Sequence, residues 1–141
     1  MAAKHKNQHA GLKVRTSVPA GSVAEMARST GELVKSSIPG RPFVRFEGSA
    51  PGRLLFSVRS MGGHMELMSF HLDVREAEGA SHAETGIDGF KTTQSTVMFI
   101  PVGPKTLVGY PEYKRFNAKL LEGLRAQDPS ASGTFVERPN G

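Results

Sequence analysis

The chain contains no cysteine among its 141 residues. This absence excludes a disulfide framework, a thiol nucleophile and a metal site with cysteine ligands. Long apolar runs are missing as well, because the longest is about "VMFI", far short of the roughly 20 residues that span a bilayer. The N-terminal "MAAKHKNQHAGLKV" has basic residues but no apolar core, so it does not read as a secretory signal. We therefore expect a soluble, cytoplasmic protein with no membrane span.

Charge of both signs is present, with a formal net charge of +5. Such an excess can indicate a nucleic-acid or anionic-lipid partner. However, four of the 18 Lys and Arg residues lie within the first fifteen positions, where there is no acid, and the rest of the chain is almost neutral. Aromatic residues make up only 7% and fall on apolar stripes, which does not suit a base-stacking platform. Nucleic acid is therefore not expected as a partner.

The length suffices for one domain with a real hydrophobic core, and 38% hydrophobic residues is an ordinary globular proportion. Residues 1–11 hold no periodic apolar residue and are expected to form a disordered basic tail. Residues 128–141, "DPSASGTFVERPNG", begin with a helix-stopping proline and continue with small polar residues, so a disordered C-terminal tail is expected. The single domain is expected to span residues 12–127.

Three segments predict the elements that frame the domain. "LKVRTSV" at 12–18 alternates apolar and polar residues, which is typical of a half-buried strand. Ser22 and Glu25 have the spacing of a capping box, which predicts a helix start there, and "IPG" at 38–40 would stop that helix. Its apolar stripe is Val23, Met26, Ala27, Thr30, Leu33 and Val34, with Gly31 inside it. A last helix is predicted at Pro111–Gln127, with the stripe Tyr113, Phe116, Leu120, Leu121 and Leu124.

Between residues 43 and 100 the pattern predicts antiparallel strands with one buried face. The expected hairpin connections are "GSAPG", "GGH" at 62–64, "REAEGA", and "DG" at 88–89 as a two-residue turn. These registers pair Phe46 with Leu54, Phe56 with Phe70, Leu72 with Ala83, and Thr85 with Thr92. All of them place the same apolar residues on one face: Val44, Phe46, Leu54, Phe56, Val58, Met68, Phe70, Leu72 and Ile87. This agreement predicts a β-meander.

The predicted fold class is therefore α+β: an antiparallel β-meander sheet packed against a long C-terminal helix, with a helical segment between the first two strands. This order resembles the helix-grip fold of the Bet v 1-like superfamily, also called START-like or polyketide-cyclase-like. The resemblance covers residues 12–126, and "FVRFEGSAPGRLLFSV" is similar to the family's second strand, glycine-rich loop and third strand. One helix stands where the family often has two.

The resemblance implies a chamber between the sheet and the C-terminal helix that holds an apolar or amphipathic small molecule, lipid-like or polyketide-like. At one end of the inner face polar residues replace apolar ones, which suits an amphipathic ligand or, alternatively, a wet sheet edge. The expected ligand-binding residues are Phe56, Phe70, Thr85, Thr92, Gln94, Leu107, Tyr110, Tyr113 and Phe116.

Leu107 and Tyr110 belong to the segment "FIPVGPKTLVGYPEYKRF", whose prolines and glycines predict a linker rather than a strand. Pro101 would mark the end of the final strand, and Pro111 fits the first turn of the last helix. We expect this linker to cross an open end of the sheet. Its apolar residues would cap the chamber or, equally, form a satellite of the core.

Histidine and acid alternate three times on the predicted strands, at His64/Glu66, His71/Asp73 and His82/Glu84. The expected register places His71 opposite Glu84 and Asp73 opposite His82, a square of four side chains that could bind a metal. Because this square lies on the face away from the apolar one, cross-strand charge contacts are the preferred interpretation. No metal and no cofactor are expected.

Three function classes remain open. The leading one is binding of an apolar small-molecule ligand, and the second is a cyclase or dehydratase that uses the same chamber. The third is a non-catalytic structural module with a filled core, a possible homodimer through exposed apolar residues such as Met65 and Leu67. An enzyme would need an acid or a histidine on the inner face, and none is assigned there, so no catalytic residue is predicted.

Overall fold

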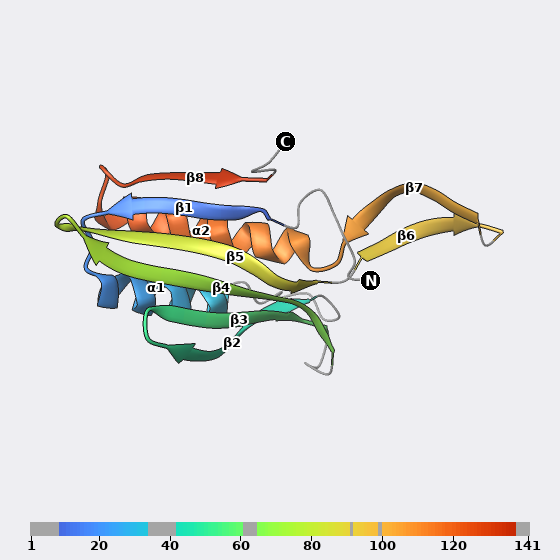
Figure 1. The fold of residues 1–141 in the computed structure, drawn as a ribbon, viewed down its shortest axis with the longest axis horizontal. Helices are drawn as coiled ribbons and strands as arrows, with labels where there is room; N and C mark the ends of the chain where they lie inside the picture. Colours follow the sequence, from blue (N-terminus) through green and yellow to red (C-terminus); the bar gives the residue numbers. More distant parts are fainter. Residues whose placement is uncertain (1–8, 34–41, 61–64, 91, 99, 138–141) are drawn as a thin grey trace.

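The computed structural model describes residues 9–33, 42–60, 65–90, 92–98 and 100–137. These residues confirm the predicted fold class: an antiparallel sheet of six strands, a separate two-stranded hairpin, and two helices (Figure 1). The elements are β1 (Gly11–Thr16), α1 (Ala20–Leu33), β2 (Phe43–Ala50), β3 (Arg53–Arg59), β4 (Glu66–Ala77), β5 (Ala80–Phe90), β6 (Thr92–Val97), β7 (Ile100–Leu107), α2 (Tyr110–Gln127) and β8 (Ser132–Val136).

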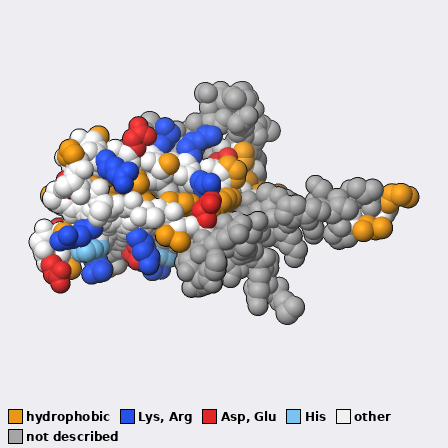
Figure 2. All heavy atoms as spheres, turned by 90° about the horizontal axis from the view of Figure 1, so that it is seen from above, with side chains coloured by type: hydrophobic (Ala, Val, Ile, Leu, Met, Phe, Trp, Pro, Cys, Tyr) orange, Lys and Arg blue, Asp and Glu red, His pale blue; other side chains and the backbone are white. Residues whose placement is uncertain are grey.

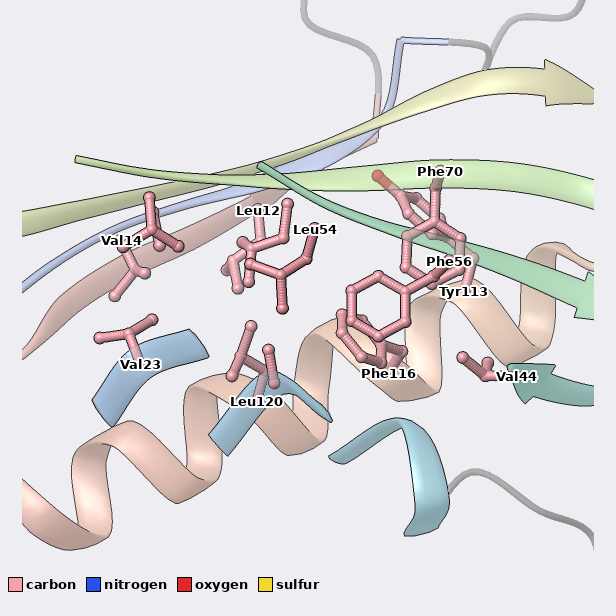
Figure 3. Packing of buried hydrophobic residues seen from close by; sticks show 14 of the residues in the cluster. Leu12, Val14, Val23, Val44, Leu54, Phe56, Phe70, Tyr113, Phe116 and Leu120 are labelled. Carbon is pink, nitrogen blue, oxygen red and sulfur yellow. The ribbon is translucent and has the colours of Figure 1, made fainter. Parts of the chain in front are cut away.

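The sheet has the strand order β2-β3-β4-β5-β1-β8, and both helices cover the same face of it (Figures 1 and 3). Side chains that point toward the helices form one hydrophobic core, whose inner strand positions include Leu12, Val44, Phe56, Phe70 and Leu72. The opposite face, called the outer face below, carries mostly charged and polar side chains, because successive residues of a strand point to opposite sides.

The middle of the meander has the predicted register, since Phe56 lies opposite Phe70 in the β3–β4 pair. The first hairpin differs from the prediction: Phe46 lies opposite Phe56, not Leu54. The turn is only Pro51–Gly52, with Gly52 at φ 73°, and a bulge follows Phe46. The predicted pairing was wrong by two residues, and a shift of two keeps every side chain on its face.

The β4–β5 hairpin shows the same kind of error. Its turn is Glu78–Gly79, both with positive φ (55° and 76°), which is the geometry that two-residue hairpins prefer. Leu72 therefore lies opposite Thr85 and not Ala83. The "DG" at 88–89 is not a turn, because it lies within β5, beside an irregularity in the β4–β5 register. The predicted pairing of Thr92 with Thr85 is therefore wrong as well.

The strands β6 and β7 pair with each other in a hairpin separate from the six-stranded sheet. Figure 1 shows this hairpin, called the arm below, projecting beyond the end of the sheet at which β4 begins. The expected linker thus contains the strand β7, and Pro101 lies within that strand, opposite Thr96. Pro101 is tolerated because each strand of a two-stranded hairpin is an edge strand.

The C-terminal segment also differs from the prediction. Residues 132–136 form β8, which pairs antiparallel with β1 where a disordered tail was expected. β1 in turn lies between β5 and β8. The expected N-terminal tail falls mostly on residues 1–8, which lie outside the described residues, so that expectation stays a prediction.

The two helices begin close to the predicted positions. α1 starts at Ala20, whose backbone N–H donates to Glu76 Oε1 of β4 at 3.1 Å, so Ser22 is not the N-cap. Gly31 continues the helix; a Cβ built on it would lie 3.4 Å from Phe56 Cε1, so α1 approaches the core closely there. α2 follows Gly109 at φ 84°, with Pro111 in its first turn as predicted. Val34 and the predicted "IPG" stop lie outside the described residues.

Neither helix of the described chain combines the length and the hydropathy that crossing a membrane would need.

Candidate functional site

Four of the predicted ligand-binding residues meet between α2 and the sheet: Phe56, Phe70, Tyr113 and Phe116 (Figure 3). The rings of Phe56 and Phe70 stack at a centroid distance of 5.3 Å, and the ring of Phe116 lies 4.9 Å from that of Phe56. Tyr113 packs edge-on against Phe70, also at 4.9 Å. Each of the four is at most 1% exposed. The rings therefore pack against one another as in a filled core, and their role as ligand-binding residues stays a prediction.

A buried polar cluster lies next to these rings, with Thr85 at its centre. The Thr85 hydroxyl donates to Asn117 Oδ1 at 2.6 Å and accepts the backbone N–H of Leu12 at 2.8 Å. The Tyr113 hydroxyl donates to the carbonyl of Ala10 at 2.7 Å. Burial raises the pKa of Tyr113 to about 12, so its hydroxyl stays protonated and remains a donor. At the polar end of the predicted chamber, the Thr85 hydroxyl thus makes its hydrogen bonds to other groups of the protein.

The remaining predicted residues lie elsewhere. Thr92, Gln94 and Leu107 are positions of the arm, where Thr92 lies opposite Leu107, and not of the inner face of the six-stranded sheet. Tyr110 opens α2, is half-buried, and donates its hydroxyl to Glu137 Oε1 at 3.0 Å. Its ring lies 6.2 Å from that of Tyr113. The structure therefore brings together five of the nine predicted positions directly, with Tyr110 beside them.

The large apolar side chains that are exposed in the described chain lie at the arm tip and at two separate positions of the β3–β4 pair. Met98 and Ile100, at the tip of the arm, are 86% and 65% exposed. Apolar side chains coloured at the far tip in Figure 2 mark this place. Leu55 of β3 and Met65, just before β4, are 39% and 52% exposed. Leu67, which was expected on the outer face, is half-buried and packs against the core.

The predicted square of histidines and acids is wrong, because the β4–β5 register is shifted by two residues. Asp73 lies opposite Glu84, and His82 lies opposite Arg75. His71 instead has its Nδ1 at 2.8 Å from Asp88 Oδ1. These groups do lie on the outer face, as expected. Among the described residues no group of three or more histidines and acids has a geometry that could hold a metal ion.

Acids of the outer face over β2–β4 are paired with arginines. Arg53 binds Asp73 through two hydrogen bonds of 2.6 and 3.0 Å, which lowers the pKa of that carboxyl. Glu47 accepts from Arg45 at 2.7 Å, and also from the Ser57 hydroxyl and Arg59, so its pKa falls to about 2. The carboxylates of Asp73 and Glu47 therefore already have hydrogen-bond partners within the protein.

Hollows that open to solvent lie on both sides of the sheet. One of about 710 Å³ lies on the outer face over β4, β5, β1 and β8 and is lined by residues that include Arg15, Arg75, His82 and Ser132. A smaller one, about 300 Å³, lies beneath α1 and is lined in part by Ala24, Phe46, Leu54 and Val74. Phe56, Phe70, Tyr113 and Phe116 line neither of them.

Sequence reasoning missed two features that matter here. The pairing Arg75–His82–Arg15 was hidden because the hairpin register was wrong and because nothing in the sequence tells which strand pairs with β1. The arm was missed because its prolines argued for a linker. A signal for it did exist, since the run "TTQSTVMFIPV" has β-branched and aromatic residues on both sides of a possible turn.

No known family model matches the chain, and neither a curated protein nor a solved structure is similar enough to it to count as a match.

Proposed function

We propose that this protein is a non-catalytic interaction module that pairs with a second copy of itself through the arm. The observation that carries this proposal is the placement of the exposed apolar side chains at two sites, the arm tip and the outer face at β3–β4. A two-stranded hairpin standing alone in water is only marginally stable, so an arm of this kind gains from packing against another surface.

The second copy is the occupant because each molecule carries both halves of the contact. Figure 1 shows the arm leaving the sheet at the end where β4 begins, which is also the end near Met65. In a two-fold dimer, the tip of one arm can therefore cover the partner copy's outer face while the partner's arm does the same in return. Burying Met98 and Ile100 would each stabilise the pair by about 1.5–3 kcal/mol.

Sedimentation velocity of the full chain over a concentration series tests this proposal. We expect a dimer that dissociates at least tenfold more readily in the double variant Met98→Ser/Ile100→Ser and in Leu55→Ser. Lys119→Ser, an exposed change on α2, is the control and should leave the dissociation constant unchanged. A parent chain that stays monomeric at several hundred micromolar contradicts the proposal, as does a monomer whose arm instead binds phospholipid vesicles.

A second candidate function keeps the ligand class predicted from the sequence but places the ligand beneath α1. Apolar residues of α1, β2 and β3 line the hollow of about 300 Å³ there, and Arg28 and Arg53 also line it. Arg28 lies over the Phe46 ring, 4.6 Å from its centroid. Small-molecule sites combine apolar walls with a few polar groups in this way. A fatty acid, with its carboxylate at an arginine, would suit this site.

Titration with a fluorescent fatty acid tests this second candidate. Ala24→Phe would fill the hollow and should abolish binding, whereas Ala118→Phe, at an exposed position of α2, should not. Equal binding by both variants, or none by the parent chain, would rule the site out.

We also propose a relationship to the helix-grip superfamily. The order strand, helix, antiparallel strands and long C-terminal helix supports it. Two features separate this chain from the expected pattern: the arm stands outside the main sheet, and β8 follows the last helix. In this proposal the gripping helix and the sheet are retained, while the interior is filled and the binding surfaces lie outside.

A further inference from the structure

Three basic side chains form a row across the outer face, at the end of the sheet away from the arm. Arg75 of β4 lies directly opposite His82 of β5, and His82 lies directly opposite Arg15 of β1. Ser132 of β8 completes the row opposite Arg15. Neighbouring strands are about 4.8 Å apart, and facing residues share one side of the sheet, so these side chains are immediate neighbours.

The two arginines of this row lie on strands that β5 separates, with His82 between them. In the described part of the chain neither Arg15 nor Arg75 has an ion pair with an acid. Their nearest acids on this face, Asp73 and Glu84, belong to the next row and are engaged by Arg53 and Lys13, respectively.

The row also has space above it. Arg15, Arg75, His82 and Ser132 all line the hollow of about 710 Å³ on the outer face. Arg15 and Ser132 also line a second hollow, of about 230 Å³, which continues toward Ser17 and Ser130. The site therefore offers two guanidinium groups, an imidazole and hydroxyl groups around an open volume. Lys13, Asp73 and Glu84 line the same larger hollow at its next row, and Asp128 lines the smaller one.

From this arrangement we infer that the outer face binds a phosphate-bearing small molecule at Arg15, Arg75 and His82. Guanidinium groups bind phosphate oxygens through paired, charge-assisted hydrogen bonds, and a serine hydroxyl adds a neutral donor. A volume of about 710 Å³ has room for a nucleotide-sized compound and not only for the phosphate group. None of the residues of the proposed dimer contact lines this hollow, so the two proposals are tested separately.

A compact ligand fits better than a nucleic-acid backbone. A long polyanion requires a continuous basic track. Here the row is followed along the strands by the carboxylates of Asp73 and Glu84, which would repel the next phosphates of a polymer. Figure 2 shows basic and histidine side chains gathered with acidic ones along one border of the molecule rather than as an unbroken basic surface.

Isothermal titration of the full chain with inorganic pyrophosphate and with ATP tests the inference. We expect saturable binding of one equivalent per chain, weakened at least tenfold by Arg15→Gln and by Arg75→Gln, because each removes a charge-assisted pair of hydrogen bonds. Arg45→Gln is the matched control: it removes the same charge from the same face but lies outside the hollow. It should change the affinity less than twofold.

Thermal melts of each variant confirm that it is folded before the affinities are compared. Absence of pyrophosphate and ATP binding by the parent chain at 1 mM would overturn the inference. So would an equal loss in all three arginine variants, because that result indicates unspecific attraction to net charge. Binding of a single-stranded oligonucleotide that pyrophosphate cannot displace would assign the row to nucleic acid instead.

Discussion

Asp128, directly after α2, joins three segments through one buried carboxylate. It accepts hydrogen bonds from the Ser130 hydroxyl at 2.5 Å, from the backbone N–H of Ser17 at 2.8 Å and from the Thr16 hydroxyl at 2.9 Å. These donors hold the pKa of Asp128 well below its usual range, and the Ser130 hydroxyl has the largest effect. The carboxylate therefore fixes the end of β1 and the start of the segment that leads to β8.

This residue predicts how stability depends on pH. A carboxyl whose pKa is lower in the folded chain contributes stability above the unfolded pKa of about 3.9, and that contribution is lost as the pH falls further. We expect the unfolding free energy of Asp128→Asn to fall less steeply than that of the parent chain between about pH 5 and pH 2. Because the pKa values of Glu47 and Asp73 are lowered as well, the unfolding free energy of Asp128→Asn still falls as the pH is lowered.

Denaturant melts at a series of pH values measure this slope. Glu122→Gln, which removes an exposed acid of α2, is the control. Identical slopes for Asp128→Asn and the parent chain would show that the carboxylate does not join the three segments in solution.

Thr85 predicts a second effect at the scale of single residues. In Thr85→Val the backbone N–H of Leu12 and the Asn117 side-chain oxygen both lose their partner in the core. Each buried polar group without a partner costs about 1–3 kcal/mol, so the unfolding free energy should fall by about 2–5 kcal/mol. Thr134→Val, on the exposed side of β8, should change it by less than about 0.5 kcal/mol. An unchanged unfolding free energy in Thr85→Val would mean that water reaches this cluster and replaces the lost hydrogen bonds.

At the scale of elements, β8 converts β1 from an edge strand into an internal one. Gly133 lies opposite Val14, and a Cβ built on Gly133 would lie 2.7 Å from Leu121 Cδ1 and 3.0 Å from Val14 Cγ2, so a larger residue there would require these side chains to shift. Phe135 adds a ring contact with Tyr113 at 6.0 Å. The strand therefore covers core residues that α2 alone leaves open.

Truncation of the chain after Ala131 tests the role of β8. We expect a lower denaturation midpoint and a smaller dependence of the unfolding free energy on denaturant, because less surface is buried on folding. Truncation after Glu137 keeps β8 and should behave as the parent chain does. If both truncations have the parent's midpoint, β8 contributes nothing and the segment behaves as the tail first expected.

The elements also show what the sequence could and could not predict. Periodicity located β1, α1 and α2 within two residues at their starts, and alternation chose the buried face of β2–β5, because burial acts on each residue locally. Thr92 and Gln94, expected on the same face, lie in the arm instead. Hairpin registers were less secure. Glu78–Gly79 and Asp88–Gly89 both have the composition of a two-residue turn. Only the strand pairing of the folded sheet shows that the first is a turn and that the second lies within β5.

The sequence could not predict which distant segments pair with each other. Nothing in "LKVRTSV" or "SGTFV" says that these two segments pair, because a strand pattern does not name its partner. For this reason the candidate phosphate site could not be predicted from the sequence. The row at Arg15, Arg75 and His82 exists only because β1 pairs with β5 and because the β4–β5 register places His82 opposite Arg75.

At the scale of the whole molecule, the interior and the surface have separate roles. Figure 3 shows an aromatic group around Phe56, Phe70 and Phe116 at one end of the core and aliphatic side chains such as Val14 and Val23 toward the other. In the described residues no buried side-chain nitrogen or oxygen lacks a hydrogen-bond partner. The contacts with other molecules that we propose lie at the arm, the outer face and the hollow beneath α1.

We infer that side chains, and not a ligand, fill the space between α2 and the sheet. The unfolding free energy of Phe70→Ala, measured against the parent chain by denaturant titration at one protein concentration, tests it most directly. Phe70 is fully buried and contacts three other rings. We expect a loss of about 3–5 kcal/mol with an unchanged denaturant slope, because the mutation would open a cavity in a packed core. A loss below about 1 kcal/mol would contradict it, because the ring would then already border empty space.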